Sequence, residues 1–364
     1  MKKILILSLA YYPRVGGAEV AIKEITDRLP GFEWHMLTMR FGALDAQEEK
    51  LGNVVVHRIG SGDSYLSKVL FIPRAALYAR RLHRQEKFDA IWAMMSYMVL
   101  PVVLGRLNIP YAITLQEGDT ERHMFGRVRI MPFMPLIKKG FHRADAVSAL
   151  STYLAKWAKD LGYRGEVAVV PQGADVARFS APRAAHQGIA LVTTSRLVHK
   201  NAIDDIICAL KLLPAHIKLL VAGVGPDEEA LRALAARLGV EARVDFLGHV
   251  PGERLPALLQ SADIFIRPSR SEGFGISFIE AMAAGLPVIA TREGGLADYI
   301  TSEVAWPVPK DSPSAIARAV EDIVSNPART REVVDRARRM VAEKYTWDAV
   351  AREMREQVFA RILG

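Results

Sequence analysis

Residues 268–291, with the sequence PSRSEGFGISFIEAMAAGLPVIAT, place two glutamates, Glu272 and Glu280, on either side of a glycine turn that leads into a predicted helix. The turn and the first N–H groups of the helix suit the binding of phosphate groups. Eight positions along an α-helix span about 12 Å, whereas the two carboxylates of a glycosidase lie roughly 5–9.5 Å apart. The spacing favours two acids that hold different ends of a long ligand, such as a nucleotide diphosphate with an attached sugar.

The same stretch also fits an ordinary amphipathic helix. In that interpretation Ile276, Ile279, Met282 and Ala283 form the buried stripe, and the glutamates lie on the solvent side. The choice between the two interpretations depends on what surrounds the stretch in the rest of the chain.

Apolar strands alternate with helices along the whole chain. In the first half we expect strands at 3–8, 34–38, 54–59, 89–93, 111–115, 145–150 and 167–170, and helices at 17–29, 66–86 and 151–161. In the second half we expect strands at 189–194, 217–222, 243–246, 263–266 and 287–290, and helices at 202–212, 227–238, 253–260, 276–284, 312–325 and 328–343. Alternation of this kind predicts α/β architecture, with two Rossmann-like, doubly wound domains whose ligand-binding strand ends face a central cleft.

Length and composition agree with two domains. The chain has 364 residues, of which 50% are hydrophobic, and an unpatterned segment at 181–188 predicts a boundary between domains 1–180 and 181–345. No apolar run reaches the roughly 18 residues of a spanning helix. The apolar start, Ile4 to Ala10, imitates a signal peptide but leads directly into a turn and a helix, which favours a buried first strand. With one cysteine, Cys208, and no zinc-like Cys/His spacing, we expect a cytoplasmic protein without a metal.

Several short motifs, in order along nearly the whole chain, carry a resemblance to a known family. They are Gly16-Gly17-Ala18-Glu19, Pro171-Gln172-Gly173-Ala174-Asp175 with Phe179, Ser195-Arg196-Leu197 with Lys200, Ala222-Gly223-Val224-Gly225-Pro226, the stretch from Glu272 to Glu280, Gly294-Gly295 and Tyr345-Thr346-Trp347. Their order and spacing make the match specific. The chain resembles the retaining glycosyltransferases of family 4, which have the GT-B fold. The resemblance implies that the last segment, 346–364, crosses back as a helix onto the first domain.

Two cations follow the first strand of the second half, Arg196 and Lys200. An arginine fork and a lysine point charge at this place can neutralise a diphosphate, although two solvated surface cations would look the same. The resemblance implies that this pair holds the donor diphosphate and stabilises it as the leaving group. The family usually has a glycine after the lysine, where this chain has Asn201.

The resemblance assigns further donor contacts. It implies that Glu280 accepts hydrogen bonds from the ribose and that Glu272 contacts the transferred sugar, where its charge can stabilise a developing oxocarbenium ion. Backbone groups complete the expected donor site: Gly16, Gly17, Gly223, Val250, Gly275, Ile276 and Ser277. A plain turn would explain Gly223 equally well, whereas the paired glycines 16 and 17 favour a close approach of the backbone to the substrate.

The expected acceptor site follows the strand at 111–115. Many family members have a histidine, often followed by Asp, where this chain has Gln116 and Glu117. Glutamine can hydrogen-bond a sugar hydroxyl but cannot act as a base near neutral pH. A retaining front-face mechanism does not require one, since the departing phosphate can take the acceptor's proton. We expect Gln116, Glu117 and Asp119 to contact the acceptor, with helix capping an equal alternative for Asp119.

All of the net charge of +8 lies in the first half. Residues 1–180 contain 25 Lys and Arg against 17 Asp and Glu, whereas residues 181–364 contain 23 of each. Basic and apolar side chains alternate in 64–87 and in 122–143, where the second segment has six cations, Arg122, Arg127, Arg129, Lys138, Lys139 and Arg143, and no acid. This mixture suits an anionic lipid surface, or equally a helix with a core-facing side and a solvated basic side. Motifs that read nucleic acid are missing, so we expect no such partner.

The sequence therefore predicts a metal-independent, retaining glycosyltransferase of the hexosyltransferase type, without a cofactor. Its expected partners are a nucleotide-sugar donor and a glycan or lipid-linked acceptor of cell-envelope polysaccharide synthesis, at the inner face of the cell membrane. Two alternatives stay open: a sugar-nucleotide epimerase on the same scaffold, and a nucleotide-sugar binding protein without turnover. A dinucleotide oxidoreductase is disfavoured, since the first turn lacks Gly-x-Gly-x-x-Gly.

Overall fold

The computed structural model describes residues 1–119, 124–126, 130–179 and 188–364, which form two compact units. The first unit comprises Met1–Gly173 and Trp347–Gly364, and the second comprises Ala174–Thr346. The first boundary thus lies between Gly173 and Ala174, earlier than the boundary after residue 180 that we predicted. Most of the predicted linker, 181–188, lies outside the described residues. Ala174 pairs with Thr346 in a parallel bridge and donates its N–H to Tyr345 O at 2.7 Å, so the two connecting segments are held together.

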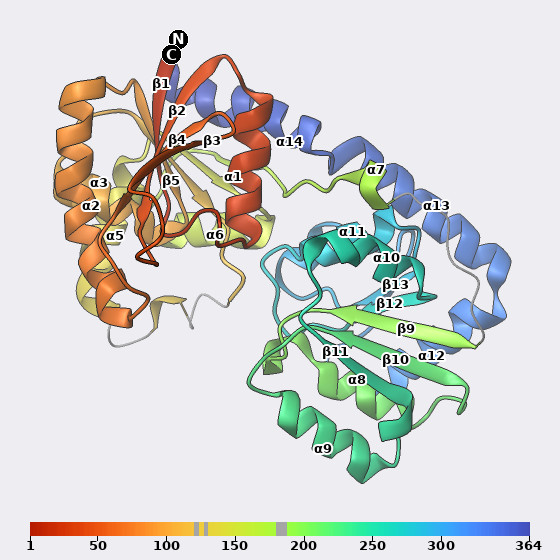
Figure 1. The fold of residues 1–364 in the computed structure, drawn as a ribbon. Coiled ribbons are helices and arrows are strands. Elements are labelled where there is room, and N and C mark those ends of the chain that lie inside the picture. The colour runs from red at the N-terminus through yellow and green to blue at the C-terminus, as the bar shows by residue number, and fades with distance from the viewer. Residues whose placement is uncertain (120–123, 127–129, 180–187) are drawn as a thin grey trace. The chain divides into compact units, whose positions relative to one another are not determined.

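The first unit is built on an eight-stranded sheet with the order β3-β4-β2-β1-β5-β6-β7-β8 (Figure 1). Its strands are β1 (Lys2–Leu7), β2 (Phe32–Met39), β3 (Glu48–Leu51), β4 (Val54–Ile59), β5 (Ala90–Met94), β6 (Tyr111–Leu115), β7 (Ala146–Ala149) and β8 (Val167–Val169). All pairs are parallel except β3 with β4. The sequence analysis missed β3, an edge strand of mostly charged residues that has no apolar alternation to mark it.

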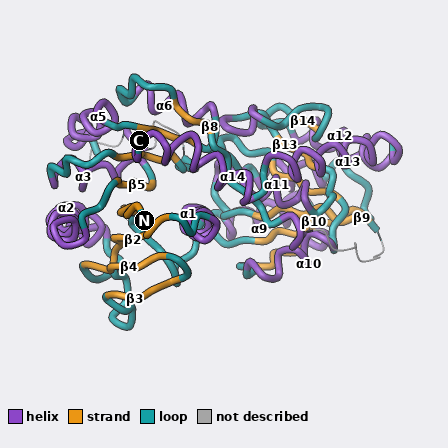
Figure 2. Tube along the Cα trace, turned by 90° about the horizontal axis from the view of Figure 1, so that it is seen from above, coloured by secondary structure: helices purple, strands orange, loops and turns teal. Residues whose placement is uncertain are grey.

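Helices cover both faces of this sheet, as a parallel sheet requires. On one face lie α1 (Gly17–Arg28) and the C-terminal segment, made of α14 (Trp347–Glu353), a π-helical stretch (Met354–Phe359) and α15 (Ala360–Leu363). On the other side the figures show α2 (Tyr65–Glu86), α3 (Val99–Gly105) and α5 (Met134–Arg143) (Figures 1 and 2). A further helix, α6 (Thr152–Asp160), contacts β7 and β8.

An aromatic cluster fixes the C-terminal segment on the first unit. The ring of Phe359 lies 5.4 Å from that of Trp34 and 5.3 Å from that of Trp92, both in edge contact, and all three side chains are fully buried. Because a π-helical turn brings residues five apart onto one side, Met354 and Phe359 both face this core. The predicted return of the last helix to the first unit is confirmed.

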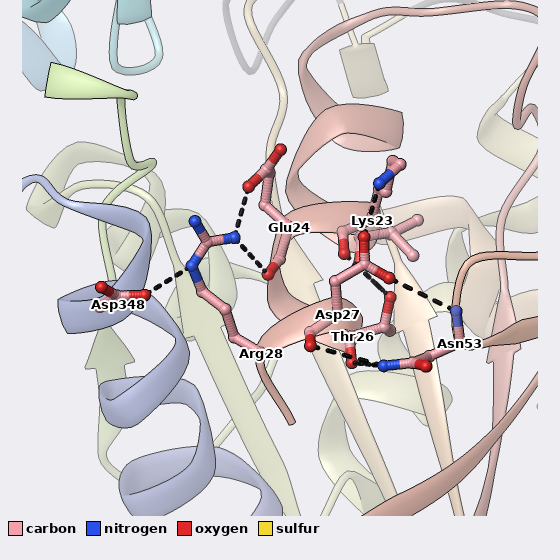
Figure 3. Close-up of polar contacts among 8 residues, drawn as sticks. Lys23, Glu24, Thr26, Asp27, Arg28, Asn53 and Asp348 are labelled. Atoms are coloured by element: carbon pink, nitrogen blue, oxygen red, sulfur yellow. Dashed lines mark hydrogen bonds and ion pairs between the residues drawn. The ribbon is translucent and has the colours of Figure 1, made fainter. Parts of the chain in front are cut away.

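Polar contacts also join the C-terminal end of α1 to α14 and to the turn between β3 and β4 (Figure 3). Arg28 pairs with Glu24 one turn earlier and donates from Nε to Asp348 Oδ1 at 2.7 Å, which joins α1 to the first turn of α14. Asn53, from the turn between β3 and β4, donates from Nδ2 to Thr26 O at 3.2 Å. These pairs are solvent-exposed, so we attribute the attachment of the C-terminal segment to the buried aromatic rings instead.

The second unit contains a six-stranded parallel sheet with the order β11-β10-β9-β12-β13-β14. Its strands are β9 (Ile189–Thr194), β10 (Ile217–Ala222), β11 (Val244–Gly248), β12 (Ile264–Arg267), β13 (Val288–Ala290) and β14 (Trp306–Pro307). Its helices are α7 (Val176–Phe179), α8 (Ile203–Leu210), α9 (Glu228–Leu238), α10 (Leu255–Gln260), α11 (Ile276–Ala283), α12 (Pro313–Ser325) and α13 (Pro327–Lys344). The predicted two parallel-sheet α/β domains are confirmed.

The two basic and apolar segments behave differently. In α5 the apolar residues Ile137 and Phe141 are buried, whereas Lys138 and Lys139 are exposed, as expected of a core-facing helix. In α2 an apolar side is also buried, but Leu66 and Leu77 remain 64% and 70% exposed. Arg122, Arg127 and Arg129 lie outside the described residues. Among the helices that the structure describes, none is both long enough and apolar enough to cross a bilayer.

We expect Phe359→Ala to lower the free energy of unfolding of the first unit by about 3–5 kcal/mol, because it removes a large buried ring from between two tryptophans. Denaturant unfolding followed by tryptophan fluorescence measures this, since Trp34 and Trp92 contact the ring directly. The exposed Arg355 on the same segment supplies the control, and Arg355→Ala should change the value by less than about 0.5 kcal/mol. Equal effects of the two substitutions would contradict the assigned role of the aromatic cluster.

Candidate functional site

A pocket of about 230 Å³ opens at the carboxyl edge of the second sheet. It is lined by the ends of β9 and β10 and by the segment after β11: Thr194, Ser195, Arg196, Ala222, Gly223, Val224, His249, Val250 and Leu255. Three residues predicted for the donor site from different segments, Arg196, Gly223 and Val250, thus lie in one pocket. Open α/β sheets bind their ligands at this edge.

Gly223 shapes the wall of this pocket. Its φ is +146°, and a Cβ at this position would lie 1.8 Å from the carbonyl oxygen of Ser195. Its N–H donates to Gly248 O at 2.7 Å, and Leu197 N donates to Val224 O at 3.0 Å. The glycine is therefore required by the close approach of two backbone segments, which supports the turn interpretation of this residue.

The turn that carries the two predicted phosphate ligands is closed by Asn201. The amide Nδ2 of this buried residue donates to Arg196 O at 2.7 Å, and the following residue, Ala202, adopts the left-handed conformation with φ +55°. The exposed side chain of Arg196 and the half-buried side chain of Lys200 are thus carried on one short turn between β9 and α8. At the position after Lys200, where the family usually has a glycine, the side-chain amide of Asn201 thus holds the turn through its hydrogen bond to Arg196 O.

Arg270 fixes the other side of this turn. Its N–H donates to Lys200 O at 2.7 Å and its Nη1 donates to His199 O at 2.8 Å. The guanidinium also makes a two-bond pair with Asp204 at 2.8 and 2.9 Å and contacts Asp311 at 2.6 Å. Hydrogen bonds to these carboxylates raise the pKa of Arg270, so it stays charged. The loop after β12 and the Lys200 turn are therefore one rigid assembly.

The first glutamate of the opening stretch, Glu272, pairs with a buried arginine that ends β12. Arg267 donates from Nη2 to Glu272 Oε2 at 2.6 Å, from Nη1 to Ser277 Oγ at 2.8 Å and to Thr194 O at 3.1 Å. Its guanidinium lies 4.3 Å above the ring of Phe278. The other oxygen of Glu272 accepts from Gly273 N at 3.1 Å. The carboxylate is therefore held in one orientation at the sheet edge.

The predicted N–H donors lie where α11 begins. Gly275 is the N-cap residue, with φ +82°, and the helix starts at Ile276 and Ser277. The first N–H groups of a helix have no partner within the helix. A Cβ on residue 275 would come within 2.6 Å of the ring of Phe278, so the turn needs glycine. The hydroxyl of Ser277 is taken by Arg267, which leaves its backbone N–H as the group that can face a ligand.

The second glutamate, Glu280, makes no ion pair with any arginine that the structure describes. Burial raises the pKa of Glu280 to about 7, against the opposing influence of Arg178 and Arg267. A carboxyl group with this pKa is partly protonated near neutral pH. It can therefore donate as well as accept hydrogen bonds, and a ligand with hydroxyl groups would compensate for its burial.

The expected acceptor residues lie in the first unit. Glu117 is 1% exposed, and its Oε1 accepts from Ser96 N at 2.7 Å, so its carboxylate supports the loop after β5 and presents no surface to an acceptor. The half-buried Gln116 is different, because neither atom of its amide has a hydrogen-bond partner among the described residues. Asp119 is half-buried.

The two glycines of the first turn have partners within the first unit. The carboxylate of Glu19 accepts from Gly16 N at 2.7 Å, which caps α1, and Gln172 Nε2 donates to Gly17 O at 2.8 Å. A Cβ on residue 17 would lie 3.2 Å from Gln172 Nε2 and 3.7 Å from Gln116 Nε2. Gly17, Gln116 and Gln172 therefore lie together at the carboxyl edge of the first sheet.

One group of side chains among the described residues has metal-ligand spacing: Glu33, His35 and Glu86. Lys3 Nζ lies 3.0 Å from Glu33 Oε1 and 2.8 Å from Glu86 Oε2, so an ammonium group already neutralises both carboxylates. The group lies toward the amino end of β1 and β2, the edge of the first sheet opposite to the one where Gly17 and Gln116 lie.

Sequence reasoning missed Arg267 and Arg270. Both follow apolar strand residues and would look like ordinary surface cations at a strand end. For Arg267 one signal was present in the sequence. It directly follows three apolar strand residues, and a cation buried at such a place requires an anionic partner, which Glu272 in the next loop supplies.

Models of two protein families match the chain in succession. The model described as Glycosyltransferase Family 4 matches residues 15–178, and the model described as Glycosyl transferases group 1 matches residues 178–340. An uncharacterized glycosyltransferase of Methanocaldococcus jannaschii is 40% identical over 167 residues, which are 45% of this chain and 43% of that protein. A GDP-mannose-dependent alpha-(1-6)-phosphatidylinositol monomannoside mannosyltransferase of Mycobacterium tuberculosis is 26% identical over 379 residues, which cover 97% of each chain.

Solved structures share the fold at low sequence identity. Sucrose-phosphate synthase of Thermosynechococcus elongatus has a TM-score of 0.84 at 20% identity and covers 99% of this chain and 100% of its own. The HepE protein of Anabaena, solved with UDP-glucose, has a TM-score of 0.79 at 18% identity with the same coverage. With the two family models end to end over the two units, the chain belongs to family 4 of the glycosyltransferases and has their GT-B fold.

Proposed function

We propose that this glycosyltransferase moves a sugar from a nucleotide-diphosphate sugar to an acceptor hydroxyl with retention of the anomeric configuration and without a metal. The observation that carries the proposal is the pocket of the second unit, where the Arg196 turn meets the loops after β10 and β11. The Anabaena structure contains UDP-glucose and the mycobacterial relative depends on GDP-mannose, which supports a nucleotide sugar but leaves the base open.

In this proposal the donor lies along the carboxyl edge of the second sheet. The base contacts the backbone near Val250, and Glu280 binds the ribose hydroxyls. Arg196, Lys200 and the first N–H groups of α11, at Ile276 and Ser277, bind the diphosphate. Glu272, held by Arg267, faces the transferred sugar. Because hydrogen bonds hold Glu272 and the backbone of the turn that carries Arg196, little order has to be created at these two places when the donor binds.

The chemistry follows from these positions. The bond between the anomeric carbon and the phosphate oxygen breaks while the acceptor oxygen bonds to the same face of that carbon. The acceptor's proton passes to the departing phosphate, since Gln116 cannot take it near neutral pH. Arg196 and Lys200 neutralise the charge that grows on the diphosphate, which is the task that a metal ion performs in other enzymes. The carboxylate of Glu272 stabilises the positive charge that develops on the sugar.

We further propose a lipid-linked acceptor of cell-envelope synthesis, bound at the inner face of an anionic membrane. The mycobacterial relative acts on a phosphatidylinositol monomannoside, and a relative in Salmonella typhimurium, 28% identical over 61% of this chain, is a putative colanic acid biosynthesis glycosyltransferase. The exposed cations Lys138 and Lys139 on α5 lie in the half of the chain that carries the whole charge excess. Lysines near an anionic surface contribute roughly 1 kcal/mol each to membrane binding.

A screen of UDP-, GDP- and ADP-sugars for thermal stabilisation tests the donor site. One of them should raise the melting temperature, because a ligand at 100 times its Kd stabilises the folded state by about 2.7 kcal/mol. Arg196→Ala should weaken this ligand at least tenfold, whereas Arg318→Ala, which removes an exposed arginine of α12, should not. If no nucleotide sugar stabilises the protein, or if both variants bind equally well, the assignment of the pocket is wrong.

Glu280→Gln should stabilise the unliganded protein at pH 8 more than at pH 5. Between pH 4.5 and 7 the unfolded state loses the Glu280 proton before the folded state does, so the wild-type protein loses stability as the pH rises. A shift of this size corresponds to roughly 3 kcal/mol above pH 7. Denaturant titrations of both proteins at the two pH values measure the difference, and an equal gain at both would contradict it. The same substitution should weaken nucleotide binding.

Glu272→Gln should lower kcat by about 10²–10³ while the affinity for the nucleotide diphosphate changes less than threefold or so. The amide can still accept a hydrogen bond from Arg267, so the loop should keep its conformation. Transfer assays and nucleotide titrations of the same preparation separate the two effects. A parallel loss of nucleotide affinity would show that Glu272 does not contact the sugar.

Two further measurements test the proposed chemistry. NMR of the glycosidic product shows whether the anomeric configuration is retained. The transfer rate should be unchanged after treatment with EDTA, because no metal takes part.

A further inference from the structure

The first unit contains an apolar cavity of about 440 Å³ that none of the assigned roles uses. Its walls come from the N-terminal half of α2, from the 3-10 turn Ser96–Met98 with α3, and from Met124, Ile130 and Phe133. The lining consists almost wholly of hydrocarbon side chains, among them Val69, Leu70, Ile72, Met98, Leu100 and Leu104. Its size falls within the range of roughly 300–1,000 Å³ that is usual for small-molecule sites.

The mouth of the cavity exposes apolar surface to solvent. Leu70 is 40% exposed, Leu104 is 43% exposed and Tyr65 is 53% exposed, and all three line the cavity. Single exposed leucines are ordinary on a protein surface, but a cluster around a hollow marks a binding site. Pro73 of α2 also lines the cavity and has no N–H to donate to the carbonyl of Val69, so the helix wall is irregular at this point.

The cavity lies at the same edge of the sheet as the expected acceptor residues. Leu9, which follows β1, and Tyr97 and Met98, which follow β5, are part of its lining. Ser96, next to Tyr97, donates its N–H to Glu117, the neighbour of Gln116. The buried contact of Glu117 with Ser96 therefore joins the loop that carries the unpartnered amide of Gln116 to the wall of the cavity.

One cation lines the cavity, and further cations lie on the same helix, α2. Lys68 lines it and pairs with Asp63 at 2.8 Å. Farther along α2 the exposed Arg80, Arg81 and Arg84 make no ion pair with any residue that the structure describes. An anionic amphiphile would meet an apolar hollow for its chain and positive charge beside it, which is the complementarity that lipid-binding surfaces use.

We propose that this cavity binds one hydrocarbon chain of the acceptor, so that the acceptor is an anionic lipid with its head group beside Gln116. The inference rests on the proposed function and adds the site of the chain. A peptide segment fits less well, because its backbone N–H and C=O groups would find almost no partner on this lining. The hydroxyl of Tyr97 is already directed to Met95 Sδ at 3.3 Å. A hydrocarbon chain needs no such partner.

Binding of a fluorescent polyene fatty acid, below its micelle concentration, tests the proposal. The wild-type protein should bind it saturably at one site, and dodecyl phosphate should displace it whereas inorganic phosphate should not. Leu70→Asp should weaken binding at least tenfold because it places a charge in the cavity mouth. Leu104→Trp should weaken it similarly by filling the cavity, which guards against a folding defect of the first variant. Leu77→Asp is the matched control on the same helix, since Leu77 is 70% exposed and lies outside the cavity lining.

The inference would be wrong if the wild-type protein showed no saturable binding of the fatty acid. It would also be wrong if Leu77→Asp lowered the affinity for the fatty acid as much as Leu70→Asp does. The latter would mean that the whole helix surface, not the cavity, takes up lipid. Nucleotide-sugar stabilisation is measured on the same preparations. If the wild-type protein binds a nucleotide sugar but not the fatty acid, the cavity site alone is wrong. If the wild-type protein binds no nucleotide sugar, the proposed function is wrong, and binding of the fatty acid still reports on the cavity.

Discussion

The candidate donor site depends on one buried ion pair, Arg267 with Glu272. A guanidinium that is 6% exposed costs several kcal/mol in lost hydration unless its hydrogen bonds are satisfied. Here a carboxylate, a carbonyl and a hydroxyl accept hydrogen bonds from its two Nη atoms, and an aromatic face covers it, whereas its buried Nε has no partner among the described residues. Those partners come from the end of β9, from the loop after β12 and from the first turn of α11. Removal of either charge would leave the other buried alone, so the loop has one stable arrangement.

The two glutamates of the opening stretch consequently have opposite electrostatic states. Glu272 has an arginine and a backbone N–H, and its negative charge is compensated within the protein. Burial raises the pKa of the half-buried Glu280 to about 7, and no described residue donates a hydrogen bond to its carboxyl group, so the unliganded protein loses folding free energy at this position near neutral pH. Such a cost persists at sites that a ligand completes. The pair of environments supports two roles: a fixed charge at the sugar and a hydrogen-bonding group at the ribose.

The sequence was sufficient for most of the fold because apolar runs of strand length alternate with helices. β4, β6, β9 and β10 have the predicted bounds. The sequence also brought together three residues predicted for the donor site, which line one pocket because residues after parallel strands converge at one edge. The sequence was insufficient where contacts between side chains distant in the sequence determine the local structure. The burial of Glu117 against Ser96, the clasp of Asn201 on Arg196 and the network of Arg270 join residues far apart in sequence or depend on side-chain direction, which no local pattern encodes.

The charge difference between the halves follows from what each unit has to hold. In the second unit the cations are used locally, since Arg267 and Arg270 are paired with acids that fix loops at the sheet edge, and the balance of charge is zero. In the first unit the exposed cations Arg80, Arg81 and Arg84 of α2 and Lys138 and Lys139 of α5 make no ion pair with a described residue, and α2 also forms a wall of the apolar cavity. Unpaired like charges on one helix layer repel one another, and they stabilise nothing within the unit. Their arrangement becomes favourable when an anionic amphiphile neutralises them, which is why the charge excess and the apolar cavity are best explained together.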